Sequence, residues 1–194
     1  CDLSPGKLTF GVGIGGEDRN EMKAVEIDPA TRGKRTDEAL KILRSLLDGE
    51  TVDYSGGFYS VPSVSIRPTP SPPVPITIGG RSDAAIERTG RLGDGWLASW
   101  CSPERFQNGV LKSQDVAEKC GRADVQWRHG YQIWVGFGDT PKEGKEVLGP
   151  AMERFYGTSF SFFEKYSPVG SPSEIANWLK PFIESGAKDL NIAP

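Results

Sequence analysis

Short apolar runs alternate with helix-like segments along the 194 residues, and this alternation constrains the fold more than any other feature. The runs are bounded by glycine or proline, as buried strands are. We predict these strands at 7–12, 75–78, 95–99, 127–135 and 188–192. Strands that alternate with helices form a parallel sheet, which closes as a doubly wound open sheet or as a (β/α)8 barrel. In both architectures ligands bind at the carboxyl ends of the strands.

The predicted helices carry recognisable end signals. Thr36 is expected to cap the first helix, Asp37 and Glu38 to favour its positive start, and Gly49 to end it. We predict the remaining helices at 83–91, 103–119, about 141–155 and 171–185, the last one opened by a capping box. Pro181 lies inside the last helix and lacks a backbone N–H, so a kink is expected there.

Two segments interrupt the alternation. Residues 51–75 are predicted to form a small hairpin, with 52–54 pairing with 58–61, followed by a proline-rich extended connector. Residues 155–170 are rich in phenylalanine and tyrosine, which suits either a lid over a substrate or a packing surface in the core or between two copies. We expect a single domain over residues 1–194 that contains both segments.

Composition and charge exclude several classes of protein. The net charge is −3 with acidic and basic residues interleaved, so the sequence offers no basic face for nucleic acid. It has no apolar run long enough for a membrane span and no secretion signal at its start, so a cytoplasmic location is expected. The cysteines, Cys1, Cys101 and Cys120, form neither a CxxC motif nor a Cys/His cluster, so no structural metal site is predicted.

Two glycine-rich motifs follow predicted strands. The stretch GVGIGG at 11–16 fits the dinucleotide pattern GxGxxG, but the segment after it is a poor helix, so we interpret it as a strand end that bends over a ligand. The stretch GGRS at 79–82 lies between a strand and a helix. Its backbone N–H groups, the helix start and Arg81 could together bind phosphate, although a tight turn with an exposed arginine explains the same residues.

Four segments, taken in order, resemble one protein family. They are GKLTFGVGIG, RGKRTDEALKILRSLLDGETVDYSGGFYSV, PPVPITIGGRSDAAIERTGRLGDGWL and GSPSEIANWLKPFIESGAKDLNIA. Together they are similar to the luciferase-like monooxygenases, the bacterial luciferase superfamily. The resemblance implies a (β/α)8 TIM barrel of bacterial luciferase type, and the matched segments correspond to its fourth to eighth strands. The first three strands are therefore expected to be absent from this chain, which is then a piece of a longer protein, a chain completed by another chain, or a degenerate relative.

The resemblance also implies site residues, because members of this family bind FMN or coenzyme F-420 at the carboxyl ends of the strands. It assigns the cofactor phosphate to Gly79, Gly80, Arg81 and Ser82. It places the isoalloxazine or ribityl portion along Gly11, Val12, Gly13 and Gly15. Bacterial luciferase carries a cysteine and a phosphate-binding arginine where this chain has Gly13 and Ile14, which favours Arg81 as the phosphate cation and the broader oxidoreductase branch over light emission.

Other residues near strand ends are weaker candidates. Trp100 and Cys101 follow a predicted strand and could border the substrate pocket, although packing explains both. His129 lies at the amino end of a strand, so a structural or solvent-exposed place is expected. Glu17 and Asp18 could reach a substrate but fit a solvated loop better.

The resemblance implies two-electron chemistry on a small organic substrate. With reduced FMN and dioxygen the reaction is an oxygenation, and a flavin reductase would then supply the reduced FMN; with F-420 it is hydride transfer. No catalytic acid or base can be assigned. A homodimer is expected. The alternatives are a non-catalytic flavin-binding relative, an inactive barrel fragment, or a sugar-phosphate barrel enzyme that uses the same phosphate turn.

Overall fold

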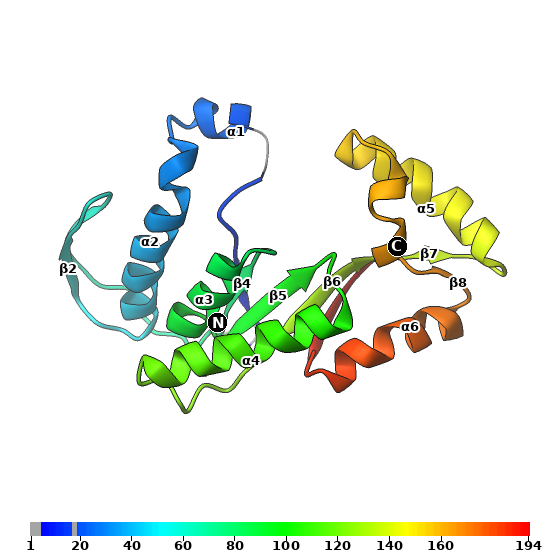
Figure 1. Ribbon diagram of the computed structural model, residues 1–194. Helices are drawn as coiled ribbons and strands as arrows, with labels where there is room; N and C mark the ends of the chain where they lie inside the picture. Colours follow the sequence, from blue (N-terminus) through cyan, green and yellow to red (C-terminus); the bar gives the residue numbers. More distant parts are fainter. Residues whose placement is uncertain (1–4, 17–18) are drawn as a thin grey trace.

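The computed structural model describes residues 5–16 and 19–194, and its centre is one five-stranded sheet (Figure 1). All neighbouring strands in it are parallel, in the order β1-β4-β5-β6-β9. The strands are β1 (Phe10–Val12), β4 (Ile76–Gly79), β5 (Gly95–Ser99), β6 (Gly130–Trp134) and β9 (Asp189–Ala193). The predicted parallel α/β fold is confirmed, and the described residues form a half-barrel that is open at β1 and at β9.

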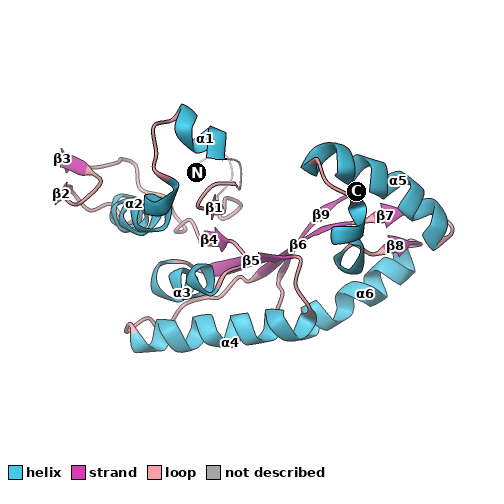
Figure 2. Ribbon diagram, turned by 45° about the horizontal axis from the view of Figure 1, so that its top comes forward, coloured by secondary structure: helices cyan, strands magenta, loops and turns pink. Residues whose placement is uncertain are grey.

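Helices cover one face of this sheet. They are α2 (Arg32–Leu47), α3 (Asp83–Leu92), α4 (Pro103–Lys119) and α6 (Pro172–Glu184). Figure 2 shows α3, α4 and α6 lying along the same side of the strands. None of the described helices is long and apolar enough to cross a membrane.

A second, smaller sheet supports the remaining long helix, α5 (Pro141–Tyr156). It pairs β7 (Gly136–Phe137) with β8 (Val169–Gly170) in parallel. No sequence pattern predicted these strands, because two residues are too few to show a period. Between α5 and β8, the aromatic segment forms two single turns of 3-10 helix, η2 (Phe160–Phe162) and η3 (Glu164–Tyr166).

Side-chain alternation divides the main sheet into two faces. Towards the helices it presents large buried residues, including Ile76, Ile78, Trp96, Tyr131 and Ile133. The alternate positions therefore face the open, concave side and, apart from Leu97, are small or polar: Gly11, Thr77, Gly79, Ser99, Gln132 and Asn191. The hydrophobic core lies outside the half-barrel, and the concave face is left for other groups.

The hairpin is confirmed with shifted bounds, and the segment before α2 is more ordered than expected. Strand β2 (Val52–Ser55) pairs antiparallel with β3 (Ser60–Val64). Between β1 and α2 the chain forms a short helix, α1 (Arg19–Ala24), and a 3-10 turn, η1 (Pro29–Thr31).

The predicted start of the first long helix is wrong. Helix α2 begins at Arg32, and Thr36 lies inside it with its hydroxyl donating to the carbonyl of Arg32 at 2.9 Å. Asp37 forms ion pairs with two arginines of α3 instead of capping. The Glu38 carboxylate is buried and accepts hydrogen bonds from the Tyr54 hydroxyl and from the backbone N–H of Phe58, both at 2.8 Å. Asp37 and Glu38 therefore have partners in other elements, although their spacing in the sequence suggested a helix start.

The first strand is shorter and more exposed than predicted. Only Phe10–Val12 pairs, and Phe10 is 46% exposed because β1 has a partner strand on one side only in the described part of the chain. The fourth predicted strand shrinks to Gly130–Trp134. Helix α6 continues through Pro181 to Glu184.

Candidate functional site

The two glycine motifs lie side by side at the carboxyl ends of neighbouring strands. In the parallel pairing of β1 with β4, Val12 lies opposite Ile78, so Gly13 and Gly79 come next on the two strands. Segments more than sixty residues apart in the sequence therefore meet at one edge of the sheet, as the predicted site requires.

The GGRS turn has a defined conformation. Gly80 adopts φ +136°, and a Cβ there would lie 2.9 Å from the Cβ of Ala85, so only glycine fits without strain. Ser82 is the N-cap of α3, because its hydroxyl oxygen accepts from the N–H of Ala85 at 3.3 Å. The serine of the turn therefore caps the helix that follows it.

Backbone N–H groups at the turn are available to a ligand. No described residue accepts a hydrogen bond from the backbone N–H of Ser82, Asp83 or Ala84, at the start of α3. The first amides of a helix have no partner within the helix, and its dipole adds partial positive charge at this end. These groups fit the phosphate that FMN and F-420 share, because a phosphate needs several donors that converge on one point.

The acidic side chain at the start of α3, Asp83, is paired with two cations. The Asp83 carboxylate is paired with Arg105 at 2.5 Å and with Lys112 at 3.7 Å, and the hydrogen bond from Arg105 is the main reason that the pKa of Asp83 is lowered. The guanidinium carbon of Arg81 lies 5.2 Å from the centre of the Trp100 ring. A cation at the turn is thus held by an aromatic face.

The glycines of the first motif leave open space. A Cβ built on Gly11 or on Gly13 would meet no described heavy atom within 4 Å, so the backbone there is accessible to a flat group. Gly15 differs, because its φ of +90° requires glycine and its Cβ would collide with the methyl group of Met22. The open space suits the predicted place for a flavin or deazaflavin ring.

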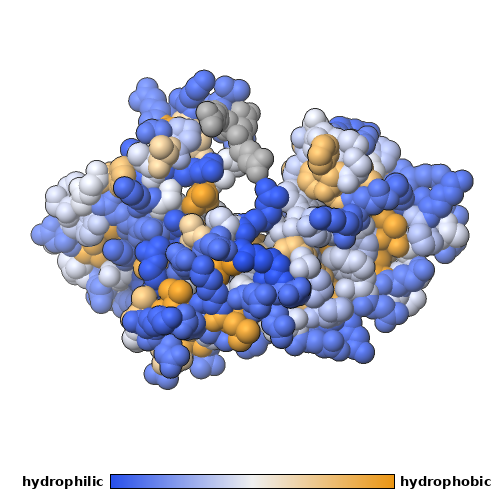
Figure 3. Space-filling view, viewed as in Figure 1, coloured by the Kyte–Doolittle hydropathy of each residue, from blue (hydrophilic) through white to orange (hydrophobic). Residues whose placement is uncertain are grey.

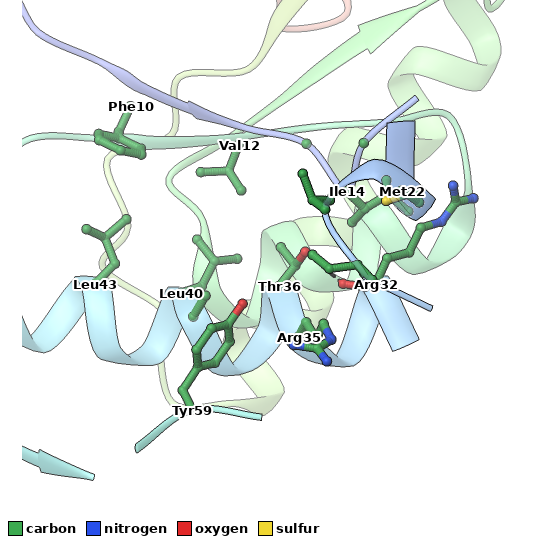
Figure 4. A pocket seen from close by; sticks show the side chains of 15 residues that line it. Phe10, Val12, Ile14, Met22, Arg32, Arg35, Thr36, Leu40, Leu43 and Tyr59 are labelled. Carbon is green, nitrogen blue, oxygen red and sulfur yellow. Dashed lines mark hydrogen bonds between the residues drawn. The ribbon is translucent and has the colours of Figure 1, made fainter. Parts of the chain in front are cut away.

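A pocket of about 550 Å³ lies on the other side of β1, between that strand and α2 (Figure 4). Val12 points into this pocket together with Phe10, Leu40 and Leu43. The Val12 side chain therefore faces the helices. Gly13 and Gly15 also line this pocket, whereas Gly11 does not.

The structure separates Trp100 from Cys101, which the sequence placed in one pocket. The Trp100 ring contacts Arg81, Tyr156 and Phe163. Cys101 lines a different pocket, of about 490 Å³, between the start of α4 and helix α6. Burial raises the pKa of its thiol to about 11, so the thiolate is scarce at neutral pH.

The remaining candidates have structural places or lie outside the described residues. His129 is 2% exposed, which confirms a structural place and excludes the solvent-exposed alternative. Glu17, Asp18 and Cys1 are outside the described residues. Among the residues that are described, no group of three or more histidine, cysteine or acidic side chains is arranged to hold a metal ion.

Trp96 supports the turn and was missed as a site residue. Its indole N–H donates to the carbonyl of Gly80 at 2.7 Å, while its ring stacks on Phe106 in the core. Gly109 of α4 makes room for this ring, since a Cβ there would lie 2.2 Å from it. The sequence could have indicated this role, because a buried tryptophan usually donates its N–H to a partner.

We expect Trp96→Phe to loosen the turn without unfolding the protein. The variant keeps most of the apolar burial and loses one hydrogen bond, worth about 0.5–1.5 kcal/mol. Backbone amide hydrogen exchange measured by NMR should become faster at Ala85 and Ile86, whose N–H groups donate to the carbonyl of Ser82 in the turn. The control is Trp127→Phe, which changes a tryptophan that does not contact the turn. Equal protection of the turn in both variants would contradict the assigned role of Trp96.

Fold and site together define a class: an α/β half-barrel with a glycine-rich strand-to-helix turn at the carboxyl edge of its sheet. Comparison with known proteins supplies the family. The sequence description of the luciferase-like monooxygenases matches residues 2–177, and the chain therefore belongs to this family. Over 178 residues it is 27% identical to an F-420-dependent glucose-6-phosphate dehydrogenase from Kineococcus radiotolerans. That match covers 90% of this chain and 51% of the relative, so the chain spans about half of that relative's length.

Solved structures show the same fold. An F-420-dependent secondary alcohol dehydrogenase in complex with an F-420-acetone adduct superposes with a TM-score of 0.81 at 19% identity, over 98% of this chain and 64% of that one. The monooxygenase RslO1 from Streptomyces bottropensis gives a TM-score of 0.79 at 21% identity, over 98% and 62% of the two chains. Both likenesses support the expected luciferase-type barrel architecture.

Proposed function

We propose that this chain forms the phosphate-binding half of an oxidoreductase that uses F-420 or FMN. The observation that carries the proposal is the GGRS turn, where the first amides of α3 have no partner among the described residues and lie with Arg81 beside the open backbone of Gly11 and Gly13. F-420 is favoured over FMN, because the relatives with assigned activities include several F-420-dependent dehydrogenases.

Each part of the site would have one task. The amides of Ser82 and Asp83 would bind the phosphate, and the Arg81 guanidinium would neutralise its charge. The backbone at Gly11 and Gly13 would lie along the ring, where a side chain would prevent close approach. When bound, the cofactor supplies two-electron transfer to or from a small organic substrate, and the protein orients the two and excludes water.

Titration of the chain with F-420 and with FMN tests this function. We expect saturable binding of one of them, and Arg81→Met should weaken it about 10- to 100-fold, because a hydrogen bond to a charged group is worth about 1.5–3 kcal/mol. The control is Arg154→Met, which removes an exposed arginine of α5 and should bind like the wild type. Failure to bind either cofactor, or equal affinity of both variants, would refute the proposal.

A further inference from the structure

Four half-buried aromatic side chains form a continuous surface beside the GGRS turn. This aromatic wall consists of Trp100, Trp134, Tyr156 and Phe163. Trp100 follows β5, Trp134 ends β6, Tyr156 ends α5, and Phe163 joins η2 to η3. Rings from separate segments therefore meet at the carboxyl edge of the sheet, on the side of the cofactor turn.

Mutual contacts and a core behind them fix the rings in place. Phe163 lies 4.9 Å from both Trp100 and Tyr156, measured between ring centres, and the Trp134 indole N–H donates to the Tyr156 hydroxyl at 2.9 Å. The rings of Trp134, Tyr156 and Phe163 pack on a buried cluster made of Leu148, Met152 and Phe160. All four wall residues keep part of their surface exposed. The wall is thus preorganised without being fully buried.

Trp100 connects the wall to the turn through a strained backbone. Its φ is +48°, in the left-handed region, which is strained for a residue other than glycine, and such strain is concentrated at functional sites. In this conformation its ring contacts Arg81 at 5.2 Å as well as Tyr156 and Phe163. A cofactor phosphate held by Arg81 would therefore lie next to the wall.

A row of polar side chains lies on the concave face near the same edge. Ser99, Gln132 and Asn191 are opposite one another in the pairings of β5 with β6 and of β6 with β9. Their neighbours along the strands, Ala98 and Tyr131, belong to the core on the helix side, so this polar row faces the opening. Within the described residues the three side chains make no hydrogen bond to other protein groups.

Figure 3 shows the molecule hollowed between the part that carries α1 and α2 and the part that carries α5, so a ligand could enter from this side. We infer that the aromatic wall and the polar row bind the substrate of the proposed reaction, and that this substrate is an uncharged, largely apolar molecule with one alcohol or carbonyl oxygen. The inference rests on the proposed function, which places the cofactor on the same edge.

The chemistry of the seven residues supports this substrate class. Ring faces bind planar or hydrocarbon groups, and neutral hydroxyl and amide groups bind a single oxygen. None of the seven residues carries a charge, and Arg81 is assigned to the cofactor phosphate. The site therefore differs from one built for the sugar phosphate after which several relatives are named.

Binding of 2-naphthol, naphthalene and glucose 6-phosphate to the full chain, measured by calorimetry, tests the inference. We expect 2-naphthol to bind best, Phe163→Ala to weaken it at least about tenfold, and Gln132→Leu to remove its advantage over naphthalene. The control is Phe162→Ala, because Phe162 is in the same segment but 70% exposed, and this variant should bind like the wild type. Phe163→Leu replaces Phe163→Ala if the latter does not fold.

Two outcomes would overturn the inference: tighter binding of glucose 6-phosphate than of 2-naphthol, or an equal effect of the Phe162 and Phe163 variants. The cofactor titration separates this failure from failure of the proposed function. If the chain binds F-420 or FMN but shows either outcome, the proposed function stands and the proposed substrate class is refuted. If the chain binds 2-naphthol through the wall but binds neither cofactor, the wall is a ligand site and the proposed function is refuted.

Discussion

Asp37→Ala is expected to lower the free energy of unfolding by about 3–5 kcal/mol. The Arg88 side chain is 5% exposed, and its guanidinium is paired with the Asp37 carboxylate and bonded to the carbonyl of Gly33 at 3.2 Å. Removing the carboxylate leaves a buried positive charge without its counter-ion. Because this pair ties α2 to α3, the loss should appear as a lower midpoint in urea denaturation.

Two further variants make this prediction specific. Arg91→Met removes the second partner of Asp37, which is 40% exposed, so it should cost no more than about 1 kcal/mol. The double variant Asp37→Leu/Arg88→Met removes both buried charges and should recover much of the stability that Asp37→Ala loses. If Asp37→Ala and Arg91→Met are equally stable, the buried pair does not have the role assigned to it.

Acid is expected to destabilise the protein through His129. Burial, and to a smaller extent the charge of Lys188, lowers the pKa of this imidazole from 6.5 to about 4. Its Nδ1 accepts from the backbone N–H of Trp96 at 3.2 Å, and its Nε2 has no hydrogen-bond partner in the described part of the chain. The folded protein therefore holds the histidine neutral, while the unfolded chain takes up a proton near pH 6.5.

Proton linkage determines whether stability rises or falls with pH. Because the unfolded chain binds the proton first, stability from His129 is complete above about pH 6.5 and falls as the pH drops to about 4. The loss reaches about 3 kcal/mol, since each pKa unit corresponds to about 1.4 kcal/mol. His129→Asn keeps an acceptor for the Trp96 N–H and cannot be protonated. Urea denaturation between pH 4 and 7 should show a smaller pH dependence for this variant; parallel curves would contradict the prediction.

Local sequence signals determined the order of the five main strands and the long helices, and the position of the GGRS turn. Gly80 and Ser82 could be identified because glycine flexibility and N-capping act within a few residues. Strand β5 and helix α4 were predicted with the observed bounds for the same reason. The roles of the candidate cofactor residues stay predictions, since they concern a ligand rather than the fold.

Only the tertiary structure decided which distant residues meet. Asp37 and Glu38 resemble a helix start in the sequence, but their partners lie in α3 and in the hairpin. Trp100 and Cys101 are adjacent, yet a left-handed φ turns them into different surroundings. The aromatic wall joins four segments through contacts that no local spacing encodes. Local propensity is set by near neighbours along the chain, whereas ion pairs and ring contacts depend on how the elements pack.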